Sequence, residues 1–387
     1  MTILHSCWHA SHLHIWGEVE ACASGLPDGP RSAVAVSPFD AGAERLCHLL
    51  RPLMPGTGET PQPATLELFL PSRAWGSGFR PVPSQPFFNN AVFDGAGEED
   101  APDFPHPWRV TAVVLPWRAT LVLLGLVREP RLADELFIGE SLLGFATLFR
   151  FAGALVARGR FLPALHRTSE KVYEARWIPA LDAADRKRLE RLAPRLPPAA
   201  FAAGNGSPRE ALEELVDRLV RASVVTTLSR AHAERGPWYS PHDAWFAALR
   251  GETRQVRWKT QAELEALAGA LRQWRQPVES GEPGKVPRFT LEVPDGPEGA
   301  WFLRVLAEEG PEGEVPPPAW DAAFLLSLGQ ASLLFPPLAR AETRGGKFGC
   351  ALSEEEAHAF LTVAAAVLEA AGYAVNLPPQ WRPGHAS

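Results

Sequence analysis

Two glycine–lysine pairs come closest to a nucleotide-binding pattern in this sequence. A phosphate-binding loop needs glycines that aim backbone N–H groups at phosphates, a lysine on the terminal phosphates and a following hydroxyl on magnesium. Val286 follows Gly284-Lys285, and Phe348 follows Gly346-Lys347, so neither pair supplies the hydroxyl. The pattern therefore predicts two surface loops and no ATP hydrolysis by this chain.

The acidic and nucleophilic residues form no catalytic pattern either. Asp134-Glu135, the only Asp-Glu pair, continues into Leu136-Phe137 and lacks the residues that help activate water beside magnesium. Glu354–Glu356 are expected in a first helical turn, where carboxylates offset the helix dipole. The sequence contains neither a G-x-S-x-G nor an H-E-x-x-H motif. We predict a protein that is not an enzyme and needs no cofactor.

Histidine and cysteine crowd the first fifteen residues, and neutral imidazole and thiolate are zinc ligands. Alternate residues of a strand stand about 7 Å apart, too far for several of them to reach one ion easily. We therefore favour a hairpin with solvated histidines over a metal site. The residues concerned are His5, Cys7, His9, His12 and His14.

Composition places the chain among ordinary globular proteins. It has 387 residues, of which 46% are hydrophobic and 21% charged, enough for two or three domains. Pro116 and Arg118 split the apolar run 110–127, which is then too short for a bilayer and predicts two buried strands. No signal-peptide pattern opens the sequence, and the four cysteines show no C-x-x-C pairing. These features predict a cytoplasmic protein with reduced thiols and no membrane partner.

Charge is distributed unevenly along the chain. The net charge is −7, yet residues 128–276 hold 24 Lys and Arg against 18 Asp and Glu, a net of +6 that leaves −13 for the flanks. The middle is therefore where phosphate contacts are expected. The alternative is that the basic cluster around 186–195 is a solvated helix face and that Trp258 belongs to a core. Our candidate DNA contacts are Arg158, Arg160, Arg186, Lys187, Arg188, Arg191, Arg195, Arg254, Arg257, Trp258 and Lys259.

The patterning predicts an α+β, multi-domain chain with three regions. Residues 1–128 are expected to be mainly antiparallel β, with long Pro/Gly-rich loops at 52–63 and 75–107. Residues 129–276 are expected to form a basic helical domain, and residues 277–387 an α/β domain. In the first region, alternating residues on both sides of Ala10-Ser11 predict a hairpin.

Capping signals fix several expected helices. Pro130 and Gly159 bracket a long helix over 131–157. Ser-x-x-Glu or Thr-x-x-Glu patterns start further helices at Ser207, Thr260 and Ser353. A Gly/Pro-rich linker is expected over 277–287. Beyond it we expect a pair of strands, RFTLEV and AWFLRVLAEE, and a closing strand over 373–377.

Several segments resemble the long N-terminal accessory region of bacterial Swi/Snf-family DNA helicases. They are RGRFLPALHR at 158–167, YEARWIPALD at 173–182, LSLGQASLLFPPLA at 326–339, FLTVAAAVLEAAGYAVNLPPQW at 360–381 and the W…IWGE pattern at Trp8 and 15–18. In that family the region precedes a superfamily-two ATPase that translocates on double-stranded DNA. The resemblance covers nearly the whole chain with gaps, and no motor motif follows.

The resemblance implies a non-catalytic accessory or targeting region that guides DNA or the motor. The implied partners are a helicase ATPase motor, in cis or in trans, and double-stranded DNA. The alternative is a protein-interaction or regulatory module, in a mobile-element or defence setting, that does not bind DNA. The net charge of −7 favours the alternative, and the +6 of the middle favours the first hypothesis.

Overall fold

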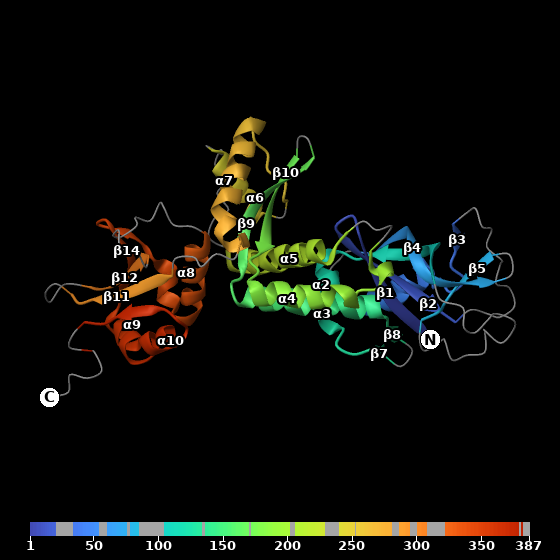
Figure 1. The fold of residues 1–387 in the computed structure, drawn as a ribbon, viewed down its shortest axis with the longest axis horizontal. Helices are drawn as coiled ribbons and strands as arrows, with labels where there is room; N and C mark the ends of the chain where they lie inside the picture. The colour runs from blue at the N-terminus through green and yellow to red at the C-terminus, as the bar shows by residue number, and fades with distance from the viewer. Residues whose placement is uncertain are drawn as a thin grey trace. The chain divides into compact units, whose positions relative to one another are not determined.

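The chain folds into two units of mixed helix and strand, which confirms the predicted multi-domain α+β class (Figure 1). Unit 1 comprises 1–154 and 184–219, and unit 2 comprises 155–183 and 220–387. This division differs from the three predicted regions, because 129–276 contributes segments to both units. The computed structural model describes residues 1–20, 34–53, 60–75, 78–84, 104–133, 136–169, 172–201, 206–228, 240–251, 253–280, 286–294, 300–307, 322–378 and 381.

A largely antiparallel sheet dominates unit 1, with strand order β5-β4-β6-β2-β1-β8-β7 and β3 added parallel to β6. Only the β1–β8 pair is parallel within that order. Helices α1, α2 and α3 and the 3-10 turns η1 and η4 accompany this sheet, and residues 184–219 add further helical segments to the unit. The bounds are β1 Thr2–His9, β2 His12–Val19, β3 Ala35–Val36, α1 Ala43–Leu50, η1 Arg51–Leu53, β4 Gln62–Trp75, β5 Gly78–Pro81, β6 Phe104–Val114, α2 Trp117–Leu126, β7 Arg131–Ala133, β8 Leu136–Ile138, α3 Glu140–Ala157 and η4 Pro198–Ala200.

The predicted N-terminal hairpin is confirmed. β1 and β2 pair in register from Thr2 with Val19 to His9 with His12. Ala10 and Ser11 form the turn with φ of 47° and 62°. Positive φ at both central residues matches the twist of two-residue hairpins, although neither residue is a glycine. Strand β5 and the ends of β4 and β6 fall inside the predicted long loops, and residues 54–59, 76–77 and 85–103 of those loops lie outside the described residues.

The prediction of two strands over 110–127 is wrong in its second half. β6 ends at Val114, and α2 begins at Trp117 with Pro116 at its N-cap. Thr120 Oγ1 donates to Pro116 O at 3.2 Å. The buried side chains of α2 are Ala119, Thr120, Leu123 and Leu124, a helical spacing. A run that is apolar on almost every side carries no periodicity that separates a helix from a buried strand.

The long helix predicted over 131–157 starts nine residues late. Its first part forms β7 and β8, and α3 begins only at Glu140. Its predicted end is confirmed, because Gly159 has a φ of 65° and terminates the helix. Gly159 N donates to Val156 O, and Arg160 N donates to Leu155 O. These are the paired hydrogen bonds of a Schellman cap.

Among the described residues, α3 is the one helix long and apolar enough to cross a membrane by length and composition. Its side chains Leu142, Phe145 and Phe151 are at most 1% exposed in the core of unit 1. A helix buried in the core of a protein can be as long and as apolar as a helix that crosses a membrane.

Unit 2 begins with a β-hairpin inside the region that we predicted to be helical. β9 and β10 pair antiparallel, and Gln255 bridges to Glu174 on the outer side of β10. Two of the Swi/Snf-like segments therefore form strands. The elements of 183–280 are α4 Ala183–Leu192, η3 Ala193–Arg195, α5 Pro208–Leu228, α6 Pro241–Arg250 and α7 Gln261–Ser280; the hairpin consists of β9 Phe161–Ser169 and β10 Val172–Pro179.

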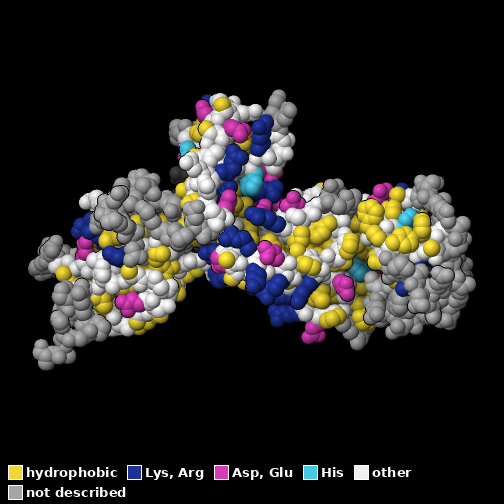
Figure 2. Space-filling model, in the orientation of Figure 1, with side chains coloured by type: hydrophobic (Ala, Val, Ile, Leu, Met, Phe, Trp, Pro, Cys, Tyr) yellow, Lys and Arg dark blue, Asp and Glu magenta, His cyan; other side chains and the backbone are white. Residues whose placement is uncertain are grey.

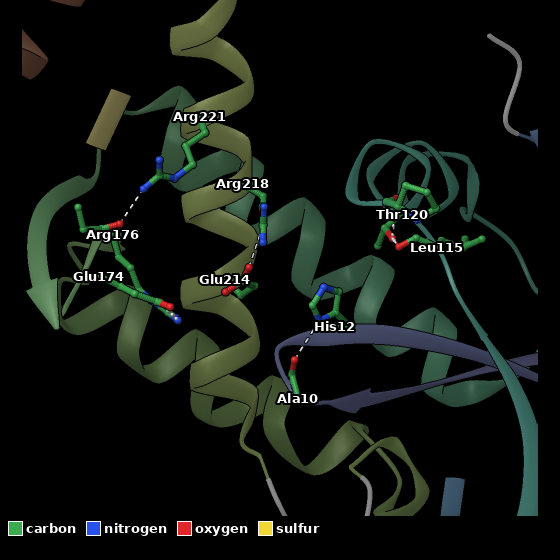
Figure 3. A network of polar contacts seen from close by, with 11 residues as sticks. Ala10, His12, Leu115, Thr120, Glu174, Arg176, Glu214, Arg218 and Arg221 are labelled. Atoms are coloured by element: carbon green, nitrogen blue, oxygen red, sulfur yellow. Dashed lines mark hydrogen bonds and ion pairs between the residues drawn. The ribbon is translucent and has the colours of Figure 1, made fainter. Parts of the chain in front are cut away.

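A buried arginine holds the hairpin to α6. The Arg221 side chain of α5 is 7% exposed. Its Nη1 donates to Ala248 O at 2.8 Å and to Gly251 O at 2.7 Å, at the carboxyl end of α6. Its Nη2 donates to Ala175 O of β10 at 2.7 Å (Figure 3). A guanidinium carries five donors in a rigid fork, so one side chain satisfies three carbonyls from two elements.

The predicted helix starts at Ser207 and Ser353 are confirmed. Glu210 N donates to Ser207 Oγ at 3.2 Å, and Ser207 N donates to Glu210 Oε2 at 3.1 Å. The same reciprocal pair joins Ser353 and Glu356. α7 begins at Gln261 as expected, but it continues through Pro277 to Ser280, so the predicted linker starts too early.

The C-terminal part of unit 2 is a five-stranded mixed sheet of order β13-β14-β12-β11-β15 with helices packed against it. The predicted strand pair is confirmed as β11 and β12, and the closing strand is β15, parallel to β11. The bounds are β11 Pro287–Glu292, β12 Trp301–Ala307, α8 Ala322–Leu334, η7 Pro336–Arg340, β13 Glu342–Arg344, β14 Lys347–Leu352, α9 Glu354–Ala359, the π-helical turn η8 Phe360–Ala364, α10 Ala365–Ala370 and β15 Ala374–Asn376.

Helix α8 has apolar residues on two sides, because it packs against two hydrophobic clusters. Phe324 and Leu328 pack into the core of the C-terminal sheet. Ala322 and Leu326 pack with Leu162 of β9 in a second cluster. No charged residue interrupts the helix.

Replacing Arg221 with methionine should destabilise the protein by about 3 kcal/mol, because three buried carbonyls lose a charged donor. Urea unfolding followed by tryptophan fluorescence measures the loss. Arg209→Met on the same helix is the matched control, since the Arg209 side chain is 67% exposed. Equal unfolding midpoints for the two variants would contradict the assigned role of Arg221.

Candidate nucleic-acid interface

Four cations form an exposed stripe along α4 and η3. Lys187, Arg188 and Arg191 are exposed on α4, and Arg195 is exposed on η3. Residues three and four apart lie on one side of a helix, about 5–6 Å from one another. Asp185, in contrast, is 4% exposed and faces the interior. The helix therefore directs its charge outward, and we call these four residues the α4 stripe.

Helix α3 supports the α4 stripe from beneath. The guanidinium carbon of Arg188 lies 4.7 Å from the centre of the buried Phe151 ring. Two turns earlier on α3 and about two turns later on the α4 side, a Cβ at Gly144 would stand 2.5 Å from Leu196 Cδ2. Position 151 thus meets 188 and position 144 meets 196, so the two segments run antiparallel. Glycine at 144 permits their close approach.

Few carboxylates of the described chain offset the positive charge of the α4 stripe. Within the described part of the chain, Lys187, Arg191 and Arg195 form no ion pair. The exposed carboxylate of α4 is Glu190. Lys and Arg side chains gather where α4 lies (Figure 2). The arrangement suits sequence-independent contact with phosphates, because it offers cations without a rigid set of polar groups that reads bases.

The remaining candidate contacts belong to unit 2, apart from Arg186, which is half-buried on α4. Arg160 Nη2 lies 3.7 Å from Asp182 Oδ2, so its charge is partly offset. Arg254 is half-buried, and its carbonyl accepts a hydrogen bond from Ala175 N. Arg158, Arg257 and Lys259 are exposed. The predicted set is therefore divided between the two units.

Trp258 has a structural place in unit 2. Its indole N–H donates to the Glu263 carboxylate. Its ring packs against the core cluster that contains Leu264 and Leu267. A tryptophan that is partly buried and hydrogen-bonded fits the structural alternative that we weighed for this residue.

Two of the four N-terminal histidines differ from the solvated set that we expect, whereas His12 is exposed as expected. His5 and His14 are each 6% exposed. Burial lowers the pKa of His14 to about 4. The His9 and His14 ring centres are 5.6 Å apart. No group of three or more His, Cys, Asp or Glu residues in the described ranges is placed to hold a metal ion.

His5 instead forms a buried polar cluster with Glu18 and Ser84. The His5 ring stacks on Trp16 with centres 4.4 Å apart. Its Nε2 lies 3.3 Å from Ser84 Oγ and 3.7 Å from Glu18 Oε2. Ser84 N donates to the same Glu18 oxygen at 2.9 Å. Ser84 and Glu18 therefore both lie at Nε2 of His5. In a catalytic triad the serine and the carboxylate lie at different ring nitrogens.

The Gly346-Lys347 pair lies in a tight turn between β13 and β14. Gly345 and Gly346 have φ of 55° and 81°, and Lys347 opens β14. A phosphate-binding loop instead leads from a strand into a helix. Gly284-Lys285 and Asp134-Glu135 lie outside the described residues.

Sequence reasoning missed the support that α3 gives to the α4 stripe. Phe151 and Gly144 look like ordinary members of an apolar helix, and nothing in the sequence links them to positions 188 and 196, which they contact. Arg150, also on α3, is exposed and donates to Val127 O at 3.0 Å. The packing of α3 against α4 is a tertiary contact, and the sequence pattern of neither helix alone predicts it.

No family model, curated protein or solved structure matches this chain.

Protonation of Glu18 should lower the stability of the protein as the pH falls. Burial opposes ionisation of this carboxyl, yet its hydrogen bonds and attraction to His5 and the Ser84 N–H hold its pKa below the usual range. A depressed pKa contributes stability that is present above the unfolded value of about 4.3 and is lost as pH falls through the folded pKa.

We expect the melting temperature to fall less steeply between about pH 5 and pH 3 in Glu18→Gln than in the wild type. Glu190→Gln, at an exposed carboxylate of the same unit, is the matched control and should keep the wild-type slope. Identical slopes for all three proteins would refute the contribution of Glu18.

Proposed function

We propose that this chain is a cytoplasmic, non-catalytic accessory region of a Swi/Snf-type DNA translocase, and that the α4 stripe contacts the phosphates of duplex DNA. The observation that carries the proposal is the stripe itself. It consists of four exposed cations along α4 and η3, three of them without an ion pair in the described chain, and α3 packs beneath it. The resemblance of the sequence segments supplies the translocase context. The role is to guide DNA or the motor, and the motor acts in cis or in trans.

Counterion release gives the proposal a quantitative form. Each phosphate neutralised on duplex DNA contributes about −0.9 to the slope of log K against log salt. Engagement of three or four phosphates by the α4 stripe therefore predicts a slope of roughly −3. Binding should be weak and independent of sequence, because the flanks carry −13 and repel the same polymer.

Changing Lys187, Arg188, Arg191 and Arg195 together to glutamine should bring the salt slope close to zero. Fluorescence anisotropy with a labelled duplex, from about 50 mM salt upward, measures the slope. Exposed charges contribute little to the core, so the variant should melt near the wild-type temperature.

The matched control removes four cations that already have carboxylate partners. Arg209 pairs with Glu213, and the other three pair with Glu356, Glu342 and Glu292 in the C-terminal part. The control changes are Arg209→Gln, Arg340→Gln, Arg344→Gln and Lys347→Gln. A slope that falls equally in both variants would mean that net charge, and not the α4 stripe, sets binding. Absence of binding by the wild type at about 50 mM salt would end the DNA-guiding role.

The non-catalytic part of the proposal has its own test. Purified chain with ATP, magnesium and duplex DNA should give background turnover, because neither Gly-Lys pair is followed by the required hydroxyl. Turnover that survives repurification and scales with protein concentration would contradict it. Lys347→Ala should leave the rate at background, since this lysine pairs with Glu292 at 2.8 Å.

A protein-interaction or regulatory module that does not bind DNA, in a mobile-element or defence setting, is the second candidate. The net charge of −7 favours it. So does the pairing of cations with carboxylates in the C-terminal part, where Arg340, Arg344 and Lys347 are each 2.8 Å from a glutamate oxygen. This candidate predicts no retardation of DNA at low salt.

A further inference from the structure

The helix formed by α9, η8 and α10 has two apolar faces. Its buried face carries Ala357, Phe360, Ala364 and Leu368 in the core of the C-terminal sheet. Its opposite face is exposed and just as free of charge. That outer face consists of Ala359, Thr362, Val363, Ala366, Val367 and Ala370.

The spacing of the outer face is that of a packing surface. Its members stand at i, i+3, i+4, i+7, i+8 and i+11, the pattern by which a helix normally covers a core. Val363 is 61% exposed and Val367 is 40% exposed. No charged residue occurs between His358 and Glu369. A solvated helix face ordinarily carries charged side chains, so this face has the composition of an interface.

Unpaired carboxylates close both ends of the outer face. Glu354 and Glu355 precede it and Glu369 follows Leu368, and all three are exposed. Within the described chain none of the three forms an ion pair, whereas Glu356 is bound by Arg340. The helix 354–370 carries no Lys or Arg. From Glu355 to Glu369 the helix spans about 21 Å, or nearly four turns.

The glutamates at the ends of the outer face indicate which kind of molecule could bind there. A second copy docked in parallel would set Glu355 against Glu355, and an antiparallel copy would set Glu355 beside Glu369. Like charges opposed in this way are unfavourable. Helices that lie on membranes carry Lys and Arg toward anionic lipids, and this helix has neither. DNA is repelled for the same reason.

We propose that this outer face docks a helix of a protein partner, one with large aliphatic side chains along one face and Lys or Arg at both ends. The small side chains on the outer face let a partner helix approach closely, and the terminal glutamates meet its cations. Figure 2 shows hydrophobic side chains beside acidic ones where Figure 1 places α10 and α9. The inference rests on unit 2 alone and is independent of DNA binding by the α4 stripe.

Two labelled synthetic helices test the proposal on the full chain. Both carry leucine at the a and d positions of about three heptads. One has lysines at both ends, and the other has glutamates there. Fluorescence anisotropy at low salt should show the lysine-ended helix binding at least about tenfold more tightly, with the difference reduced by added salt.

Variants of the chain locate the binding. Val363→Asp with Val367→Asp should weaken the lysine-ended helix by about tenfold or more, because apolar burial is lost. Glu355→Lys with Glu369→Lys should reverse the preference between the two helices. Val36→Asp with Val293→Asp changes two other valines, 53% and 41% exposed, and should leave binding unchanged. Circular dichroism confirms that each variant is folded.

Three results would overturn the proposal. The first is equal affinity for the two helices, or binding of neither. The second is unchanged binding by the Val363→Asp, Val367→Asp chain. The third is a dimer in sedimentation that this double variant dissolves, which would assign the outer face to a second copy.

Discussion

Helix α5 carries charged side chains into the protein interior, and their need for partners constrains the elements around it. A buried charge without a partner costs several kcal/mol. Glu214 is 1% exposed, and its carboxylate accepts a hydrogen bond from Arg218 Nε at 2.8 Å (Figure 3). The guanidinium carbon of Arg218 lies 4.9 Å from the centre of the Trp117 ring of α2. Three residues later Arg221 ties α6 to β10 through three carbonyls. One helix therefore sets contacts in unit 1 and, further along, in unit 2.

The same requirement separates structural cations from the α4 stripe. Arg221 is engaged with carbonyls, and Arg340, Arg344 and Lys347 are engaged with carboxylates. In the α4 stripe, Arg188 rests on Phe151, and the other three cations face solvent without an ion pair in the described chain. Cations that the fold does not use internally remain available to an external anion. We propose that phosphate is that anion, because phosphate contacts need cations but no rigid set of base-reading groups.

How much the sequence predicts depends on whether a signal is local. The hairpin at Ala10-Ser11, the capping boxes at Ser207 and Ser353 and the stop at Gly159 are local, and the structure confirms all four. The sequence of α2 predicts a strand, although the segment forms a helix, because a segment apolar on most sides has no distinguishing period. The exposed cations of α4 followed from composition, but their support by Gly144 and Phe151 and the burial of Arg221 did not, since tertiary packing decides them.

The most direct test of the central claim maps where duplex DNA touches the chain. Hydrogen exchange followed by mass spectrometry reports local protection along the sequence. At low salt, saturating duplex should slow exchange in peptides that cover 183–196, and the four glutamine changes in the α4 stripe should remove that protection. Protection confined to other segments, or protection of 183–196 that persists in the variant, would contradict the assignment of the DNA contact to the α4 stripe.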